Sequence, residues 1–512
     1  MQPWEPIEIP AGRDGINRAK NLSLVRPSHL AEADNVIADR FLFEKIPGSA
    51  KFNTVALSGP VAAHWYFVVS SVEEVVAYVV GSPNSKLVTV DAGGVVTTLN
   101  SALTPFGTTP QFAEGWNGTT KALYMASGTD RIQVHTSGGL STIDLPSPSP
   151  DWGSTTNPIC LGATNTRMAA SGVFTFPHHV YLSVPGDHND FVGTDSAVEI
   201  MYPGIGEKIV AVKSHKDRLY IGKRPNGIMW LDESDPNIAN WTRGIVTDSI
   251  GLEGHGCWLD IGDDLLILSS QGYFYLLSQV HTDGQVAVPP LLPMETSEFL
   301  KETLLFGALY QTRSIWFGHR RQAWFHIPIV GTIIIDLNEQ GNPKVFFSSA
   351  HDGKSLTLQR SSVTSVAKPS FGDDDGFIWL ADQAARNRDG DGYVGQYETV
   401  PVAVTPGGIH RANLEELQVV MQPQGNWDLD IEVLRDGVPS QTIAYSMQTP
   451  GAGTGSVSLD SDVIAGQTIA TVRHRLEGDC RYIKLIGRNE NANENFAVMS
   501  HIVRTTQGNE RP

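Results

Sequence analysis

The sequence predicts an all-β protein: a β-propeller of six to seven blades with an N-terminal arm and a C-terminal β-sandwich domain. One supporting observation is a repeat of two short apolar strands joined by Asp-Gly, Gly-Gly or Asn-Gly, clearest at 208–234, 256–279 and 313–337. The repeat recurs every 35 to 50 residues or so, roughly the spacing of propeller blades. The other observation is composition, because 50 glycines and 30 prolines favour many turns and few helices.

Residues 1–53 are predicted to form a docking arm, because they are polar and rich in proline and glycine. Within this arm, residues 28–48 are predicted to form a turn of helix followed by a strand. A ring of blades has an open edge unless a further strand closes it. The arm could supply that strand from its apolar residues, Leu30, Val36, Phe41 and Phe43.

Residues 54–400 are predicted to form the propeller. The paired-strand units within it lie at 61–99, 112–145, 159–192, 208–245, 255–288, 310–347 and 355–400. Aromatic residues in these units, such as Trp230, Trp258 and Trp324, are predicted to fill the space between neighbouring blades.

Residues 401–512 are predicted to form the β-sandwich, with 401–413 as the connection from the propeller. Apolar and polar residues alternate through 414–437, and this period of two is typical of strands with one buried and one solvated face. A turn rich in Gly, Ser and Thr follows at 449–456, before further strands.

The net charge of -18 argues against a protein that grips nucleic acid, since such binding depends on Lys and Arg displacing counterions from phosphates. The three cysteines, Cys160, Cys257 and Cys480, lack CxxC spacing, so we expect reduced, buried thiols rather than disulfides or a zinc site. A signal peptide is not predicted, because the N-terminus has no basic segment followed by an apolar stretch. A membrane span is not predicted, because the most apolar tract is broken by Glu73 and Glu74.

One motif has metal-ligand spacing. Residues 387–398 fit a calcium loop in which Asn387, Asp389, Asp391 and Glu398 are the candidate ligands, with a glycine at the bend. Oxygen ligands at alternate positions converge on a hard cation. The departures are an Asn in the first position and Gly395 in the ninth, and Asp-Gly-Asp-Gly is also typical of a plain hairpin turn. Apart from this calcium candidate, no cofactor is predicted.

Other chemical signals favour structural roles. The three carboxylates Asp373 to Asp375 are predicted to form a solvated turn, and the adjacent His178 and His179 would point to opposite faces of a strand. GxSxG, HExxH, GxxxxGKS/T and a strand-linked GxGxxG are absent from the sequence. These observations predict that the protein is not an enzyme and has no catalytic residues.

Several stretches resemble the tail-nozzle, or tail-hub, proteins of short-tailed double-stranded-DNA bacteriophages, also called packaged-DNA stabilisation proteins. Residues 15–48 are similar to their N-terminal pattern of an arm, a PxxLxxAxN segment and a strand that ends in Pro-Gly. The stretches 215–241, 249–276 and 496–504 are similar to two of their blades and to the end of their C-terminal β-sandwich.

The resemblance implies a structural subunit in the tail of a virion, made in the host cytoplasm. It implies a homo-oligomeric, hexameric ring below the portal and adaptor, in contact with tail fibre or needle proteins. Genomic DNA would be retained by this ring and would pass through it without specific binding. The alternatives are a receptor-binding or peripheral tail protein and a glycan-binding or hydrolase propeller, although the SxDxGxxW repeat of sialidase-like enzymes is absent.

Overall fold

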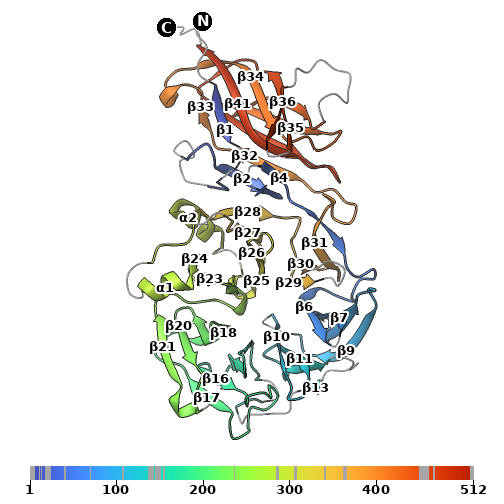
Figure 1. Ribbon diagram of the computed structural model, residues 1–512, viewed down its shortest axis with the longest axis vertical. Helices are drawn as coiled ribbons and strands as arrows, with labels where there is room; N and C mark the ends of the chain where they lie inside the picture. The colour runs from blue at the N-terminus through green and yellow to red at the C-terminus, as the bar shows by residue number, and fades with distance from the viewer. Residues whose placement is uncertain are drawn as a thin grey trace. The chain divides into compact units, whose positions relative to one another are not determined.

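The protein is all-β and consists of many small antiparallel sheets, as the sequence predicts (Figure 1). The computed structural model describes residues 6–10, 12, 14–17, 25–39, 42–69, 71–105, 109–136, 143–144, 151–153, 156–235, 237–283, 288–304, 308–338, 342–360, 366–448, 460–464 and 467–507. The α-helices among these residues are α1 (Leu277–Asp283) and α2 (Met294–Leu304).

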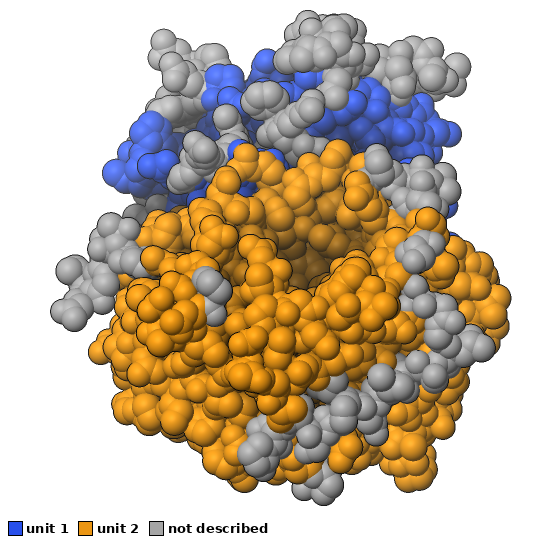
Figure 2. Space-filling model, turned by 60° about the horizontal axis from the view of Figure 1, so that its bottom comes forward, with its two compact units in different colours: residues 1–50, 333–351, 382–512 blue, residues 51–332, 352–381 orange. Residues whose placement is uncertain are grey.

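The chain divides into two compact units, coloured separately in Figure 2. Unit 1 consists of Met1–Ala50, Ile333–His351 and Asp382–Pro512, and unit 2 of Lys51–Thr332 and Asp352–Ala381. These units are defined by compactness, and a compact unit is not necessarily a segment that folds independently. The predicted domains 1–53, 54–400 and 401–512 therefore stay a prediction.

Seven small sheets follow one another along the chain, and each begins within one of the seven predicted paired-strand units or at its edge. The first two are β6 (Val61–Val69), β7 (Val72–Val79), β8 (Ser85–Asp91) and β9 (Val96–Leu103), then β10 (Gln111–Trp116), β11 (Lys121–Ala126), β12 (Gln133–Thr136) and β13 (Ile143–Asp144). The next two are β14 (Cys160–Ala163), β15 (Met168–Ser171), β16 (His179–Leu182) and β17 (Ala197–Ile200), then β18 (Lys208–His215), β19 (Arg218–Arg224), β20 (Ile228–Asp232) and β21 (Thr242–Thr247).

The fifth sheet has three strands, β22 (Trp258–Asp260), β23 (Leu265–Leu268) and β24 (Phe274–Leu276), and helix α1 begins where β24 ends. The sixth contains β25 (Arg313–Phe317), β26 (Gln322–Ile327), β27 (Gly331–Asp336) and β28 (Lys344–Ser348). The seventh has the order β29 (Ser355–Arg360), β30 (Ala367–Gly372), β31 (Ile378–Gln383) and β5 (Gly48–Lys51). The boundary between the units falls within β27, β31 and β5.

In unit 2, the first strands of most successive small sheets contact one another (Figure 1). Strands β6, β10, β14 and β18 are neighbours in that order, and the 3-10 turn at His255–Cys257 lies between β18 and β25. Strand β25 then contacts β29, and β29 contacts β6. The first strand of the first sheet therefore lies against the first strand of the seventh.

Buried hydrogen bonds join the first and seventh sheets. Asn53 is fully buried, and its amide nitrogen donates to the carbonyls of Val55 and Gly376 at 2.7 and 3.0 Å. Its side-chain oxygen accepts from the backbone N–H of Ile378 at 2.7 Å. The backbone N–H of Leu57 also donates to the Gly376 carbonyl, at 2.8 Å. The Asn53 side chain loses contact with water, so its amide groups need the partners they have here.

Two larger sheets make up most of unit 1. One has the order β3 (Val36–Asp39), β4 (Leu42–Lys45), β41 (Ala497–Gln507), β34 (Ala412–Met421), β38 (Gln467–Arg475) and β37 (Asp460–Ile464), with β1 (Ile7–Pro10) on β41 and β39 (Asp479–Cys480) on β34. The other has the order β2 (Leu30–Asp34), β32 (Gly395–Thr399), β40 (Tyr482–Asn489), β35 (Asp428–Arg435) and β36 (Val438–Ser446), with β33 (Val402–Ala403) on β40.

Buried aromatic residues connect these two sheets. Tyr397 on β32 packs edge-on against Phe43 on β4, and its hydroxyl bonds to Nε2 of His501 on β41 at 2.8 Å. The hydroxyl of Tyr445 on β36 donates to the carbonyl of Leu417 on β34 at 3.1 Å. Strand β35 alternates buried and more exposed residues, so the period of two in the sequence does mark a one-sided strand.

The N-terminal segment differs from its prediction. Residues 30–34 form strand β2 rather than a turn of helix, because pairing with β32 satisfies their backbone and outweighs local preference. Leu30, Val36 and Phe43 belong to sheets of unit 1, and the N-terminal strand in the seventh small sheet is β5. Phe41 lies outside the described residues.

Gly376 tests the join between the first and seventh sheets. Its φ is +87°, and a Cβ built there would lie 2.0 Å from the Leu57 carbonyl oxygen. We expect Gly376→Ala to lower the free energy of unfolding by roughly 1–3 kcal/mol more than Gly262→Ala. Gly262 is the matched control, because its φ is +93° and its Cβ would meet nothing within 4 Å. Urea unfolding measures both, and equal losses would show that the close approach is unimportant.

Candidate functional site

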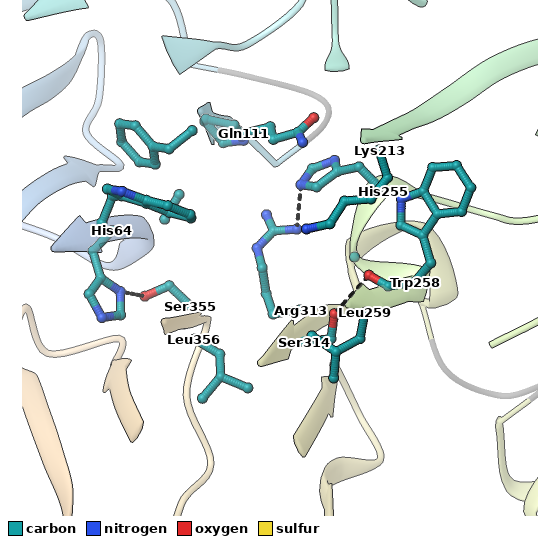
Figure 3. Close-up of a pocket in the computed structure, with 15 residues that line it drawn as sticks. His64, Gln111, Lys213, His255, Trp258, Leu259, Arg313, Ser314, Ser355 and Leu356 are labelled. Carbon is teal, nitrogen blue, oxygen red and sulfur yellow. Dashed lines mark hydrogen bonds between the residues drawn. The ribbon is translucent and has the colours of Figure 1, made fainter. Parts of the chain in front are cut away.

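A cavity of about 140 Å³ lies at the centre of unit 2. Its walls come from β6, β10, β18, β22, β25, β29 and the 3-10 turn at His255–Cys257, with Pro110 beside β10. Figure 2 shows unit 2 hollowed on one face, and Figure 3 shows the side chains that line the cavity. Segments far apart in the chain thus contribute to one space.

Arg313, the first residue of β25, points into this cavity (Figure 3). The side chain is buried, with 6% of its residue surface exposed. Its Nη1 donates to the Thr312 carbonyl at 3.0 Å and to Nε2 of His255 at 3.2 Å. Its Nε and Nη2 have no hydrogen-bond partner among the described residues. Burial lowers the pKa of Arg313 to about 9, so the guanidinium is still charged at pH 7.

His255 is held in one neutral form. A guanidinium can only donate, so Nε2 of His255 must accept and the ring proton is on Nδ1. Burial lowers the pKa of His255 well below its usual value, and the positive charges of Arg313 and Lys213 act in the same direction. Lys213 on β18 lines the cavity, and burial lowers the pKa of its ammonium group while Asp260 opposes this.

His64 on β6 lies at the opposite side of the cavity from Lys213 (Figure 3). Its Nδ1 bonds to the Ser355 hydroxyl at 2.7 Å and its Nε2 to the Ser370 hydroxyl at 3.0 Å. Ser355 and Ser370 belong to the seventh sheet, so His64 is part of the join described above. Burial lowers the pKa of His64 to about 3, which keeps the ring neutral.

No carboxylate is among the residues that line this cavity. A second cavity of about 380 Å³, lined by His255, Arg224 and Glu253 among others, differs in this respect. There Nε of Arg224 lies 2.8 Å from the Glu253 carboxylate. The walls of the central cavity therefore carry cationic groups and no carboxylate. The walls of the second cavity carry both.

Three of the calcium-loop candidates, Asn387, Asp389 and Asp391, lie in or beside a hairpin turn, and Glu398 forms an ion pair. Arg388 and Asp391 exchange backbone hydrogen bonds at 2.8 and 3.1 Å, and the residues between them, Asp389 and Gly390, have φ of 54° and 100°. This is the geometry of a tight turn. The Asn387 side-chain oxygen accepts from the Gly390 N–H at 2.9 Å, and Glu398 on β32 pairs with Lys484.

Within the described ranges, no group of three or more His, Cys, Asp and Glu residues could hold a metal ion. Calcium binding by residues 387–398 stays a prediction.

The other predicted groups have structural partners. Asp373 accepts from the Phe377 N–H at 2.8 Å and from the Trp379 indole at 2.6 Å, so it is a buried turn residue rather than a solvated one. His178 bonds to Lys223 at 3.1 Å. All three cysteines are free and buried, as predicted. Among the described residues, no helix has the length and apolar character needed to cross a membrane.

Sequence reasoning missed the central cavity. Lys213, His255 and Arg313 are separated by dozens of residues and belong to three different small sheets or the turns before them. Arg313 and Lys213 are basic residues beside apolar residues of their first strands, and this was the available signal. It indicates an unusual position, but it does not show that the two residues share a space.

Comparisons with known proteins give no family. No family model matches the chain, and no curated protein matches it. Solved structures that match the chain include the computationally designed Ika8 protein, at 10% identity and a TM-score of 0.38, covering 65% of this chain and 99% of that one. BBS1N, solved in complex with ARL6DN, matches at 11% identity and a TM-score of 0.41, covering 69% and 98%.

An enzyme is also among the similar structures, and this corrects one prediction. The exo-beta-1,3-galactanase of Phanerochaete chrysosporium matches at 10% identity and a TM-score of 0.27, covering 90% of this chain and 99% of that one. The prediction that the protein is not an enzyme is therefore withdrawn. A likeness this low assigns no reaction and no catalytic residue to the chain, and the function that we propose does not depend on an absence of catalysis.

His64 makes stability depend on pH. Its pKa is about 3 in the folded protein against 6.5 ordinarily, so between these values the unfolded chain binds a proton that the folded protein does not. The contribution of neutral His64 to the free energy of unfolding is then fully present above pH 6.5. It falls as the pH drops toward 3, by up to about 1.4 kcal/mol per pH unit. We expect His64→Gln to reduce this slope in urea unfolding at pH 7 and 5, although it also lowers stability at pH 7. His319→Gln, at an exposed site, is the control, and an equal slope in both variants would contradict the assignment.

Calcium titration tests residues 387–398. If the loop binds calcium, calorimetry of the parent protein gives a saturable signal that Asp389→Ala and Asp391→Ala each abolish. Asp375→Ala, in an exposed turn elsewhere, is the matched control and should leave the signal unchanged. A parent protein without any signal ends the calcium hypothesis.

Proposed function

We propose that unit 2 is a seven-bladed β-propeller and that unit 1 is a β-sandwich into which the N-terminal strands are incorporated. Seven small sheets in chain order support the propeller, because their first strands are neighbours in succession, with the 3-10 turn at His255–Cys257 in the fifth place. The contact of β29 with β6 and the buried bonds of Asn53 support its closure. The aromatic contacts of Tyr397 and Tyr445 support the sandwich.

We further propose that the protein is a subunit of a hexameric tail-nozzle ring of a short-tailed bacteriophage. The observation that carries this proposal is the order of parts along the chain. An N-terminal segment comes first, a run of seven small sheets follows, and a larger pair of sheets takes in both chain ends. This order agrees with the resemblance at residues 15–48, 215–241, 249–276 and 496–504.

The charge of the chain suits such a role. Each subunit has a net charge of -18, so a ring of six is strongly acidic. An acidic channel wall repels the phosphates of DNA, which lets the duplex slide without adhering. In this proposal the ring lies below the portal and adaptor and contacts tail fibre or needle proteins. It retains the packaged genome and allows its ejection at infection.

Cryo-electron microscopy of virions that contain this chain tests the proposal. We expect six copies around a central channel beneath the adaptor, each with a ring-shaped density for unit 2. Copies placed at the periphery of the tail, with no shared channel, would overturn the proposal and favour a receptor-binding or glycan-binding tail protein. A chain that is absent from purified virions would exclude both.

A further inference from the structure

The central cavity of unit 2 contains an unused hydrogen-bonding surface of Arg313. The Nη1 group is fully engaged by Thr312 and His255, whereas Nε and Nη2 have no partner among the described residues. In a guanidinium, Nε–H and one N–H of Nη2 lie side by side and parallel. Arg313 thus presents a planar two-pronged donor into the cavity, opposite the bond that fixes its orientation (Figure 3).

The surroundings give this donor no neutralising group. Carboxylates are absent from the cavity lining, and Lys213 contributes a second positive charge. Gln111, the lining amide, is already engaged at both ends, because its Nε2 donates to the Leu161 carbonyl and its Oε1 accepts from the Leu161 N–H at 2.8 and 2.9 Å. The Ser314 hydroxyl is likewise engaged, by the Trp258 carbonyl at 3.3 Å. Asp260, outside the lining, acts on Lys213, but the buried guanidinium of Arg313 has no carboxylate on the cavity walls, which is unfavourable unless an external anion compensates its charge.

We propose that the central cavity binds one small oxyanion, with two of its oxygens on Nε and Nη2 of Arg313 and with Lys213 as the second positive charge. Parallel N–H groups match two oxygens of a phosphate, a sulfate or a carboxylate, and this shared geometry is what the site recognises. The bond from Nη1 to His255 holds the guanidinium in position, because the neutral ring can accept only on Nε2.

The size of the cavity limits the ligand. A space of about 140 Å³ holds a four- or five-atom anion with a few waters, since one water-sized probe occupies roughly 10–15 Å³. Trp65, Phe112 and Trp258 also line the cavity, and apolar walls lower the local dielectric constant, which strengthens the interaction of a cation with an anion. This inference does not rest on the proposed tail function, because it depends on unit 2 alone.

Binding of inorganic phosphate to the full-length protein tests the site. In calorimetry at constant ionic strength, with chloride as the balancing anion, we expect one phosphate per chain and a rise in the thermal unfolding temperature. Arg313→Lys keeps the charge but removes the parallel donors, and we expect it to weaken binding by roughly tenfold or more. Lys213→Gln removes the second charge and should also weaken binding. Arg131→Lys, at an exposed site, is the matched control and should bind as the parent does.

Parallel titrations with sulfate and acetate identify the ligand class. Stronger binding of phosphate and sulfate indicates a tetrahedral oxyanion, and stronger binding of acetate indicates a carboxylate. If Arg313→Lys does not fold, Lys213→Gln and the parent titrations decide the question. A parent protein that binds none of the three anions overturns the proposal, as does a folded Arg313→Lys variant that binds as tightly as the parent.

Discussion

The join between the first and seventh small sheets is the constraint on which unit 2 depends. Asn53 hydrogen-bonds to Gly376 and Ile378, and His64 bonds to Ser355 and Ser370, all in buried positions. Without these bonds, β6 and β29 would each expose a flank, and the strands that surround the central cavity would lose their common centre. The join also forms part of the cavity wall, because His64 and Ser355 line the same space as Arg313 and Lys213.

Local signals predicted the small sheets, and long-range contacts escaped prediction. The strand–turn–strand repeat placed all seven units, because hairpin turns and apolar strands are local properties of the chain. The bond between Asn53 and Ile378 joins residues 325 positions apart, and no local pattern marks either one. The prediction of a turn of helix at residues 30–34 was wrong for a related reason, because these residues form a strand by pairing with β32, far along the chain. The cavity was missed because Lys213, His255 and Arg313 meet only after the sheets assemble.

The charges of the molecule are distributed in two different ways. The chain as a whole is acidic, with 55 Asp and Glu against 37 Lys and Arg. The centre of unit 2 has the opposite character, because its titratable lining residues are Arg313, Lys213 and two neutral histidines. A surface charge affects how a protein meets its partners from a distance, whereas a buried charge acts only on a group that enters. The acidic surface and the basic centre of unit 2 therefore act over different distances.

The pairing of the chain's beginning with its end affects synthesis. Strand β1 pairs with β41, with Ile7 opposite Val503, and the join of unit 2 needs residues 51–64 together with 355–381. A ribosome releases the N-terminal parts first, so β1, Asn53 and His64 must wait for partners that are made much later. Both units are therefore completed only after residues 355–503 have been synthesised, although the hairpins of the early small sheets can pair as soon as they emerge.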